Sequence, residues 1–147
     1  MTLEPLYRAR FTPTDRWSVE LGAASATEAQ SLLFVEGRCE GQIAGSLRAS
    51  NFPRRRADGV LTPDFRGVVE TDDGATILFH WEGLATLTDT GMRRLLGMAQ
   101  HTSDDQRYRW LNDRVCTVEG EVRPQAEGAG FDVVLSVSEM RWEPVST

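Results

Sequence analysis

The sequence contains no lysine, because all 16 of its basic residues are arginine. This absence excludes a Schiff-base lysine, the lysine of a phosphate-binding P-loop and a lysine general base. Long hydrophobic runs are also missing, and no apolar stretch approaches the roughly 20 residues that span a bilayer. Residues 1–5 show no basic start followed by an apolar stretch, so we expect no secretory signal, no membrane partner and a cytoplasmic location.

Metal-ligating residues are few: two cysteines, Cys39 and Cys116, and two histidines, His80 and His101. Two cysteines do not make a disulfide scaffold, and the spacing of the four residues matches no zinc pattern. Both cysteines lie in strand-like segments among apolar neighbours, which favours buried free thiols. We therefore expect no metal and no other cofactor.

The formal net charge is −6, which makes general nucleic-acid binding unfavourable, because such binding depends on basic residues that neutralise phosphates. One basic run, residues 54–56, stands out between Pro53 and the Asp58-Gly59 turn. Two interpretations are open, a solvated loop and an anion site. The flanking turn residues favour the solvated loop.

A chain of 147 residues with 40% hydrophobic and 26% charged residues fits one globular domain over residues 1–147. Short runs of period-2 alternation that end in turn signals recur along it, which is typical of antiparallel β structure. Residues 92–102 fit a helix or a strand equally well. The other runs predict strands at residues 6–11, 17–21, 31–39, 42–50, 65–71, 75–83, 108–118 and 131–142. One face of the strand predicted at 42–50 carries Ile43, Gly45, Leu47 and Ala49.

Closure of such a sheet removes two aggregation-prone edges. The predicted fold is therefore all-β: a closed antiparallel, calycin-like barrel of about eight or more strands with little helix. A barrel of that size is filled by side chains or holds one small ligand.

The clearest local signal is a hairpin around Asp73-Gly74. Asp-Gly between alternating apolar runs favours a two-residue type I′ loop, since both residues tolerate a positive φ. That loop length fixes the register of the hairpin. It predicts Val69–Leu78, Gly67–His80 and Phe65–Glu82 as pairs on one face, and Val68–Phe79 and Arg66–Trp81 on the other.

Several motifs resemble, in order and spacing, an uncharacterised family of small bacterial and fungal barrels known as domain of unknown function 3237. They are Asp58-Gly59-Val60, Asp64-Phe65-Arg66, Thr71-Asp72-Asp73-Gly74-Ala75, Gly83 and Tyr108-Arg109-Trp110-Leu111-Asn112. The resemblance covers residues 3–142. It implies a closed barrel with a cavity and a strand at residues 92–102, and it brings no established activity. Asn51-Phe52 stands where the family has an Asp-Trp pair, so an acid or base at that position would be lacking.

A first group of candidate site residues lies in the run from 108 to 118. Tyr108, Trp110, Asn112 and Arg114 share one face if this strand is regular. Aromatic rings with an amide and a guanidinium could stack and orient a planar oxygenated ligand. The alternative is a packed core in which these polar groups are satisfied internally.

The predicted hairpin supplies a second group of candidates. Arg66 opposite Trp81 is either a carboxylate clamp inside the barrel or, as we favour, a cation–π pair on its outer surface. His80 and Glu82 share the other face, where a histidine beside a carboxylate could act as a general base, although His-x-Glu on a strand is a common coincidence. Only one face can point inward, and the space left by Gly67 favours the His80 face.

The sequence is compatible with three functions. The first is a binding module for a small planar or apolar oxygenated molecule. The second is a cofactor-independent isomerase, cyclase or lyase on an aromatic or polyketide-like substrate, with one general base and an arginine or asparagine that stabilises negative charge. The third is a structural subunit of a homo-oligomer. Polar side chains converging in an open cavity would favour the enzyme, an apolar cavity the binder, and a filled barrel the structural role.

Overall fold

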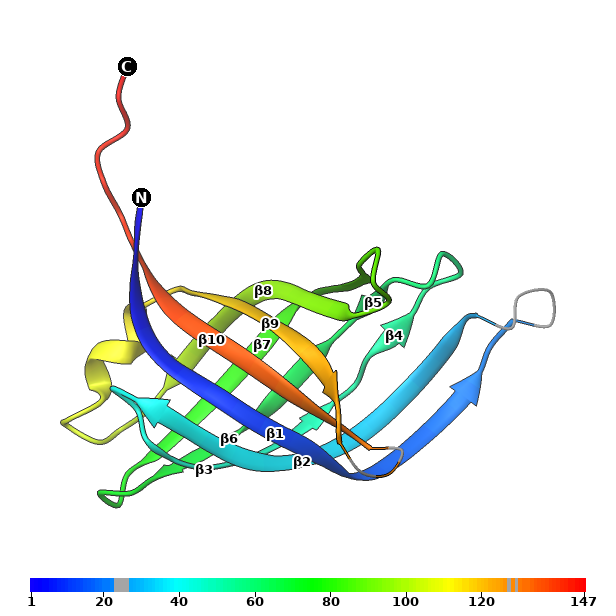
Figure 1. Ribbon diagram of the computed structural model, residues 1–147. Helices are drawn as coiled ribbons and strands as arrows, with labels where there is room; N and C mark the ends of the chain where they lie inside the picture. The colour runs from blue at the N-terminus through cyan, green and yellow to red at the C-terminus, as the bar shows by residue number, and fades with distance from the viewer. Residues whose placement is uncertain (23–26, 127, 129) are drawn as a thin grey trace.

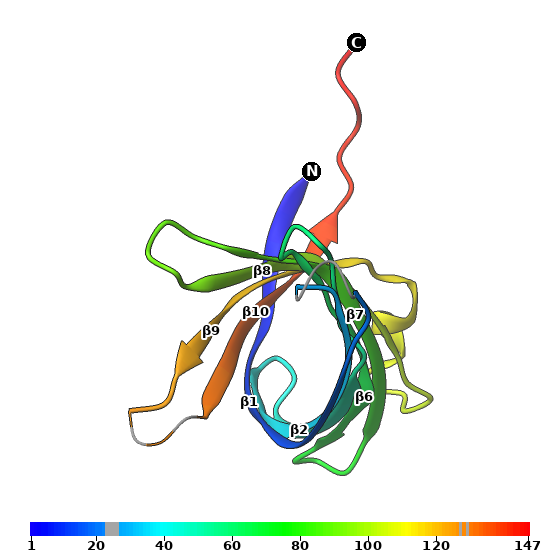
Figure 2. The same ribbon diagram turned by 90° about the vertical axis from the view of Figure 1, so that its right-hand side faces the viewer.

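The computed structural model describes residues 1–22, 27–126, 128 and 130–147. One antiparallel sheet closes on itself through pairing of the first strand with the last (Figures 1 and 2), which confirms the predicted all-β barrel. Eight strands form its wall, in the spatial order β1-β10-β9-β8-β7-β6-β3-β2 and back to β1. Their bounds are β1 (Thr2–Glu20), β2 (Ala29–Gly41), β3 (Gly45–Asn51), β6 (Asp64–Thr71), β7 (Thr76–Leu87), β8 (Arg93–Thr102), β9 (Cys116–Pro124) and β10 (Phe131–Arg141).

Two short strands extend the sheet at one end of the barrel. β4 (Arg54–Arg55) and β5 (Leu61–Thr62) lie in the connection between β3 and β6. β4 pairs with the start of β2, and Leu61 of β5 pairs with Ala85 of β7. This connection therefore bridges the ends of β2 and β7 beyond the point where β3 and β6 stop.

The strands predicted at 6–11 and 17–21 belong to the single long strand β1. The prediction of two separate strands was therefore wrong. The register of β1 shifts just after Pro5 and again just after Pro13. Proline has no N–H to give to a ladder and occurs in strands mainly at edges and bulges. The second bulge interrupts the apolar alternation without ending the strand.

The β6–β7 hairpin forms as predicted, but its register differs by one residue. The Thr71 N–H donates to the Ala75 carbonyl, and the Gly74 N–H donates to the Thr71 carbonyl, so the turn is longer than two residues. Gly74 has φ +90°, whereas no described non-glycine residue has a positive φ, which excludes a type I′ turn. The resulting pairs are Phe65–Trp81, Arg66–His80 and Asp64–Glu82. The predicted pairs were wrong, because a one-residue slip exchanges the two faces of a strand.

The run from 108 to 118 also differs from the prediction. Its first part is a 3₁₀ helix, η1 (Arg109–Asp113), and β9 begins only at Cys116. The N–H groups of Tyr108 and Arg109 both donate to the Asp105 carbonyl, which turns the chain before the strand. Residues 93–102, in contrast, form the strand that the family resemblance implied. Among the described residues, no helix is long and apolar enough to cross a membrane.

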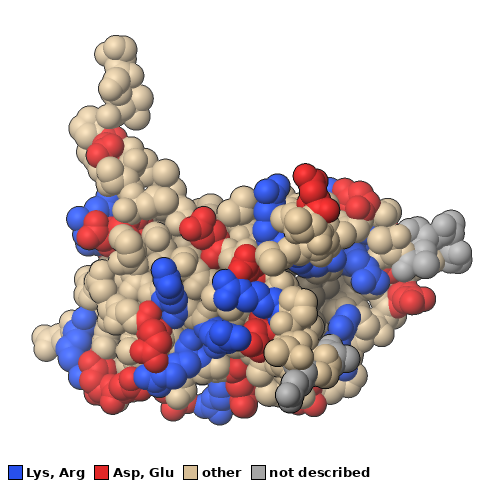
Figure 3. Space-filling view, in the orientation of Figure 1, with Lys and Arg blue, Asp and Glu red and all other residues tan. Residues whose placement is uncertain are grey.

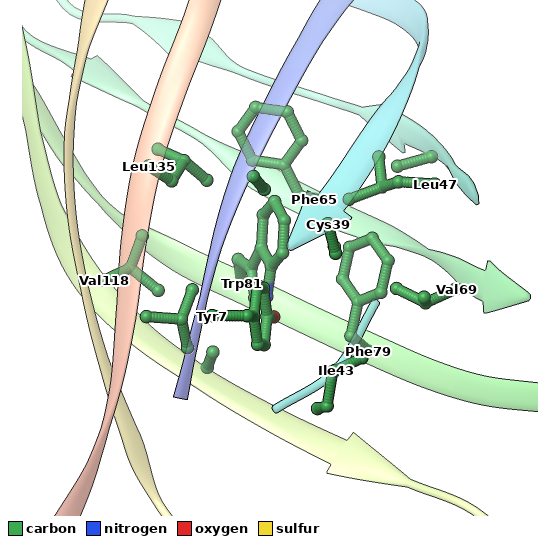
Figure 4. Packing of buried hydrophobic residues seen from close by; sticks show 14 of the residues in the cluster. Tyr7, Cys39, Ile43, Leu47, Phe65, Val69, Phe79, Trp81, Val118 and Leu135 are labelled. Carbon is green, nitrogen blue, oxygen red and sulfur yellow. The ribbon is translucent and has the colours of Figure 1, made fainter. Parts of the chain in front are cut away.

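The core extends from Leu111 of η1 to residues such as Leu33 and Leu95 near the opposite end of the barrel. Figure 4 shows aromatic rings packed among aliphatic side chains, and Trp81 stacks on Phe79 with ring centroids 4.3 Å apart. Tyr7 and the buried thiol of Cys39 belong to the same cluster. The face predicted for residues 42–50 is confirmed, because Ile43, Gly45, Leu47 and Ala49 are all buried.

Candidate ligand-binding site

The two ends of the barrel differ. η1 lies at the left end of the barrel in Figure 1, and its Leu111 is 0% exposed and belongs to the core. The Tyr108 hydroxyl donates to Oδ2 of Asp73 at 2.7 Å, which ties this segment to the β6–β7 turn. Side chains therefore fill this end.

The opposite end contains a cavity of about 300 Å³. Phe11 and Phe65 form its floor, edge to face with ring centroids 5.4 Å apart. Trp81 lies beneath them, 5.9 Å from Phe11 and 5.8 Å from Phe65 between ring centroids. The walls are hydrocarbon, from Leu33, Val35, Leu61, Leu95, Val122, Val133, Pro53 and Pro63.

Apart from arginines, few polar side chains line this cavity. Asn51 is nearly buried, and its Oδ1 accepts the N–H of Asp64 at 3.0 Å. That bond fixes the orientation of the amide, and Asn51 lines the cavity wall. Ser31 contributes a hydroxyl. Among the lining residues that the structure describes there is no aspartate, glutamate, histidine or cysteine.

Three arginines line the cavity: Arg16 of β1, Arg55 of β4 and Arg93 of β8. Arg55 Nε donates to the Thr27 carbonyl at 2.6 Å. Arg93 Nη1 lies 3.4 Å from the Gly59 carbonyl and 3.5 Å from that of Ala85. Within the described part of the chain, none of the three arginines has a carboxylate within 4.0 Å.

Burial lowers the pKa of Arg93, and the positive charge of Arg55 lowers it further. Both side chains line the same cavity, so two like charges share one partly buried site. On the outer face of the molecule seen in Figure 3, in contrast, acidic and basic side chains mix. Arg10 pairs with Asp132 and Arg48 with Glu70, each at 2.5 Å. The cavity is thus locally positive in a chain of net charge −6.

The candidates predicted on the hairpin lie outside the cavity lining. His80, Glu82 and Arg66 all point away from the barrel interior. On the outer surface, His80 Nε2 lies 2.8 Å from Asp64 Oδ1 and 3.8 Å from Glu82 Oε2. The expected inward orientation of His80 was wrong, because the longer turn shifts the register. Trp81 points inward as part of the core, and its buried Nε1 has no acceptor among the described groups.

The candidates predicted between 108 and 114 do not share one strand face, so that premise was also wrong. Trp110 Nε1 donates to the Arg107 carbonyl at 3.0 Å within the same turn. The Asn112 side chain accepts the Ser103 N–H at 2.7 Å and donates to the Ser103 carbonyl at 2.9 Å. Arg114 Nε lies 2.8 Å from Oε1 of Glu139. With Tyr108, these residues hold the filled end together.

Sequence reasoning missed the arginines of the cavity. In the run 54–56, Arg54 and Arg56 are exposed as expected for a solvated loop, but Arg55 is half-buried and faces the cavity. Period 2 could have indicated this position, because Asn51, Pro53 and Arg55 alternate toward the interior. The same period places Arg93 with Leu95 on the inner face of β8.

The fold recurs in solved structures. A β-barrel-like protein from Acinetobacter baumannii AYE is 20% identical, with 95% of this chain and 96% of that chain covered and a TM-score of 0.76. A protein of unknown function from Clostridium acetobutylicum is 16% identical, with 96% and 100% covered and a TM-score of 0.81. An enzyme from Penicillium herquei is 20% identical, with 92% and 93% covered and a TM-score of 0.64.

No curated protein matches this chain. The model of one protein family, described as "Protein of unknown function (DUF3237)", matches residues 1–140. The match spans nearly the whole barrel and confirms the resemblance seen in the sequence motifs. The chain belongs to the DUF3237 family.

Proposed function

We propose that this protein binds a small, mainly apolar molecule in the cavity at the open end of its barrel. The observation that carries the proposal is the unfilled chamber of about 300 Å³ above Phe11 and Phe65. Its size lies at the lower end of the range for small-molecule sites, roughly 300 to 1,000 Å³. A purely structural barrel would be expected to fill both ends with side chains, and here only one end is filled.

The composition of the wall fits a binding role. Apolar surface removed from water contributes about 25 cal/mol per Å², so burial of roughly 200 Å² of ligand surface supplies about 5 kcal/mol. Loss of translational and rotational freedom offsets part of this gain. A preformed aromatic floor lowers the ordering cost, since the rings are already packed against Trp81.

The alternative is a cofactor-independent enzyme in the same cavity. One observation favours it: the similar barrel from Penicillium herquei is an enzyme. An arginine at the cavity could stabilise an enolate-like charge. Against it stands the lining itself, whose described residues include no carboxylate, imidazole or thiol that would act as a general base. We therefore favour binding without turnover.

Two experiments test the binding proposal. In the first, native mass spectrometry of protein purified from its own organism should detect a co-purifying small molecule. In the second, the neutral fluorescent probe N-phenyl-1-naphthylamine is titrated into the protein and into the variant Ala85→Leu. Ala85 is buried and lines the cavity, so a leucine there occupies ligand space.

Thr86→Leu is the matched control, because it places the same side chain on the outer face of β7. We expect probe fluorescence to rise with the wild type and with Thr86→Leu and to be lost with Ala85→Leu. Equal binding by both variants, with both folded, would place the probe elsewhere and contradict the proposal. Chemical conversion of a co-purified molecule would favour the enzyme.

A further inference from the structure

We infer that the cavity selects an organic anion, a carboxylate on a flat apolar body, and that Arg55 and Arg93 hold its carboxylate. This inference rests on the proposed binding function and names the chemical class of the ligand. It goes beyond an apolar pocket, because it assigns two charged residues as the groups that determine specificity.

The two arginines are held in place without being neutralised. They come from different elements, β4 and β8, and each hydrogen-bonds only main-chain carbonyls among the described residues. A carbonyl orients a guanidinium but leaves its full charge, whereas a carboxylate would cancel it. The described outer surface pairs many of its arginines with acids, for example Arg38 with Asp72 at 2.5 Å.

Electrostatics favours an anion between the two groups. Arg55 and Arg93 repel each other in a partly buried setting, where charges are screened less than in water. An anion placed between them would add two attractions, which would offset this repulsion. Arg16 lines the same cavity and adds a third positive charge.

The other lining residues restrict the part of the ligand to which the carboxylate is attached. Below the arginines the cavity offers the rings of Phe11 and Phe65 and hydrocarbon walls, with Asn51 and Ser31 as its other polar side chains. A nucleotide would bring a polar sugar and several phosphate oxygens into this chamber, where they would lack partners. A flat apolar body fits the aromatic floor, and one carboxylate matches the planar donors of arginine.

The test compares two probes of nearly the same shape, 2-naphthoate, which is an anion, and 2-naphthamide, which is neutral. Affinities are measured by calorimetry for the wild type, Arg55→Met and Arg93→Met. Methionine keeps an unbranched side chain of similar length and removes the charge. The matched controls are Arg54→Met and Arg94→Met, which remove the same charge one position along the same strands from exposed side chains.

For the wild type we expect naphthoate to bind at least about 10-fold more tightly than naphthamide. Each cavity variant should weaken naphthoate binding by about 10- to 100-fold, the range for a lost hydrogen bond to a charged group. Naphthamide binding should stay within about 2-fold, because an amide needs no counter-charge. The exposed controls should behave as the wild type, and Arg55→Lys should retain part of the preference for naphthoate.

The outcomes separate the inference from the proposed function. Equal affinity for both probes in the wild type, unchanged in Arg55→Met and Arg93→Met, would overturn the anion selectivity and leave apolar binding intact. An effect of Arg54→Met as large as that of Arg55→Met would also overturn it, because the cause would then be general surface charge. Failure of both naphthalene probes and of N-phenyl-1-naphthylamine to bind would overturn the proposed function itself.

Discussion

The Tyr7 hydroxyl lies 2.7 Å from Nε2 of His101, and the two side chains share a hydrogen bond inside the filled half of the barrel. His101 is only 2% exposed, and its Nδ1 lies 3.9 Å from Sγ of Cys116. Burial lowers the pKa of His101 to about 4. The folded protein therefore holds this histidine in its neutral form at neutral pH.

A dependence of stability on pH follows. In the unfolded chain His101 has a pKa of about 6.5 and binds a proton that the folded state rejects. Its contribution to the free energy of unfolding is complete above about pH 6.5 and is lost as the pH falls toward about 4. At pH 5 we expect a loss of about 2 kcal/mol relative to pH 7, measured by urea unfolding.

The variant His101→Gln isolates this effect, because glutamine can bond Tyr7 but does not titrate. Its stability should change much less between pH 7 and pH 5 than that of the wild type, whatever its absolute value. The same slope in His101→Gln as in the wild type would show that other groups cause the pH dependence.

The β6–β7 turn provides a second prediction. Gly74 has φ +90°, a conformation that a β-branched residue resists. We expect Gly74→Val to lower the free energy of unfolding by about 1 kcal/mol or more, measured by urea titration. Gly74→Asn should cost less, because asparagine tolerates the left-handed region. Equal stability of the valine variant and the wild type would contradict the assigned turn.

A third prediction separates the filled end from the cavity. Asn112→Ala removes the two hydrogen bonds to the main chain of Ser103. The loss should be about 1 to 3 kcal/mol in the free energy of unfolding. Binding of N-phenyl-1-naphthylamine by the folded variant should be unchanged, because Asn112 does not line the cavity. A large loss of probe affinity without loss of stability would contradict this prediction and indicate that Asn112 takes part in ligand binding.

The sequence by itself determined the fold class, because the alternation of apolar and polar residues is a local property that each strand carries. Ile43, Leu47 and Ala49 lie inside the barrel as their spacing predicted. The sequence also determined the family, through motifs such as the segment from Tyr108 to Asn112. That segment identifies the family, but in the structure it stabilises the filled end of the barrel and does not line the cavity.

Only the tertiary structure decided which of the inward-facing side chains come together around the cavity. The Asp-Asp-Gly turn permits two lengths, and a difference of one residue exchanges the inner and outer faces of β7 relative to β6. His80 therefore lies on the outer face and Trp81 on the inner face, while Phe65 of β6 stays inside. Arg55 and Arg93 line the same cavity because β4 pairs with β2 while β5 and β8 both pair with β7. Those contacts join segments far apart in the chain, and local periodicity carries no information about such pairings.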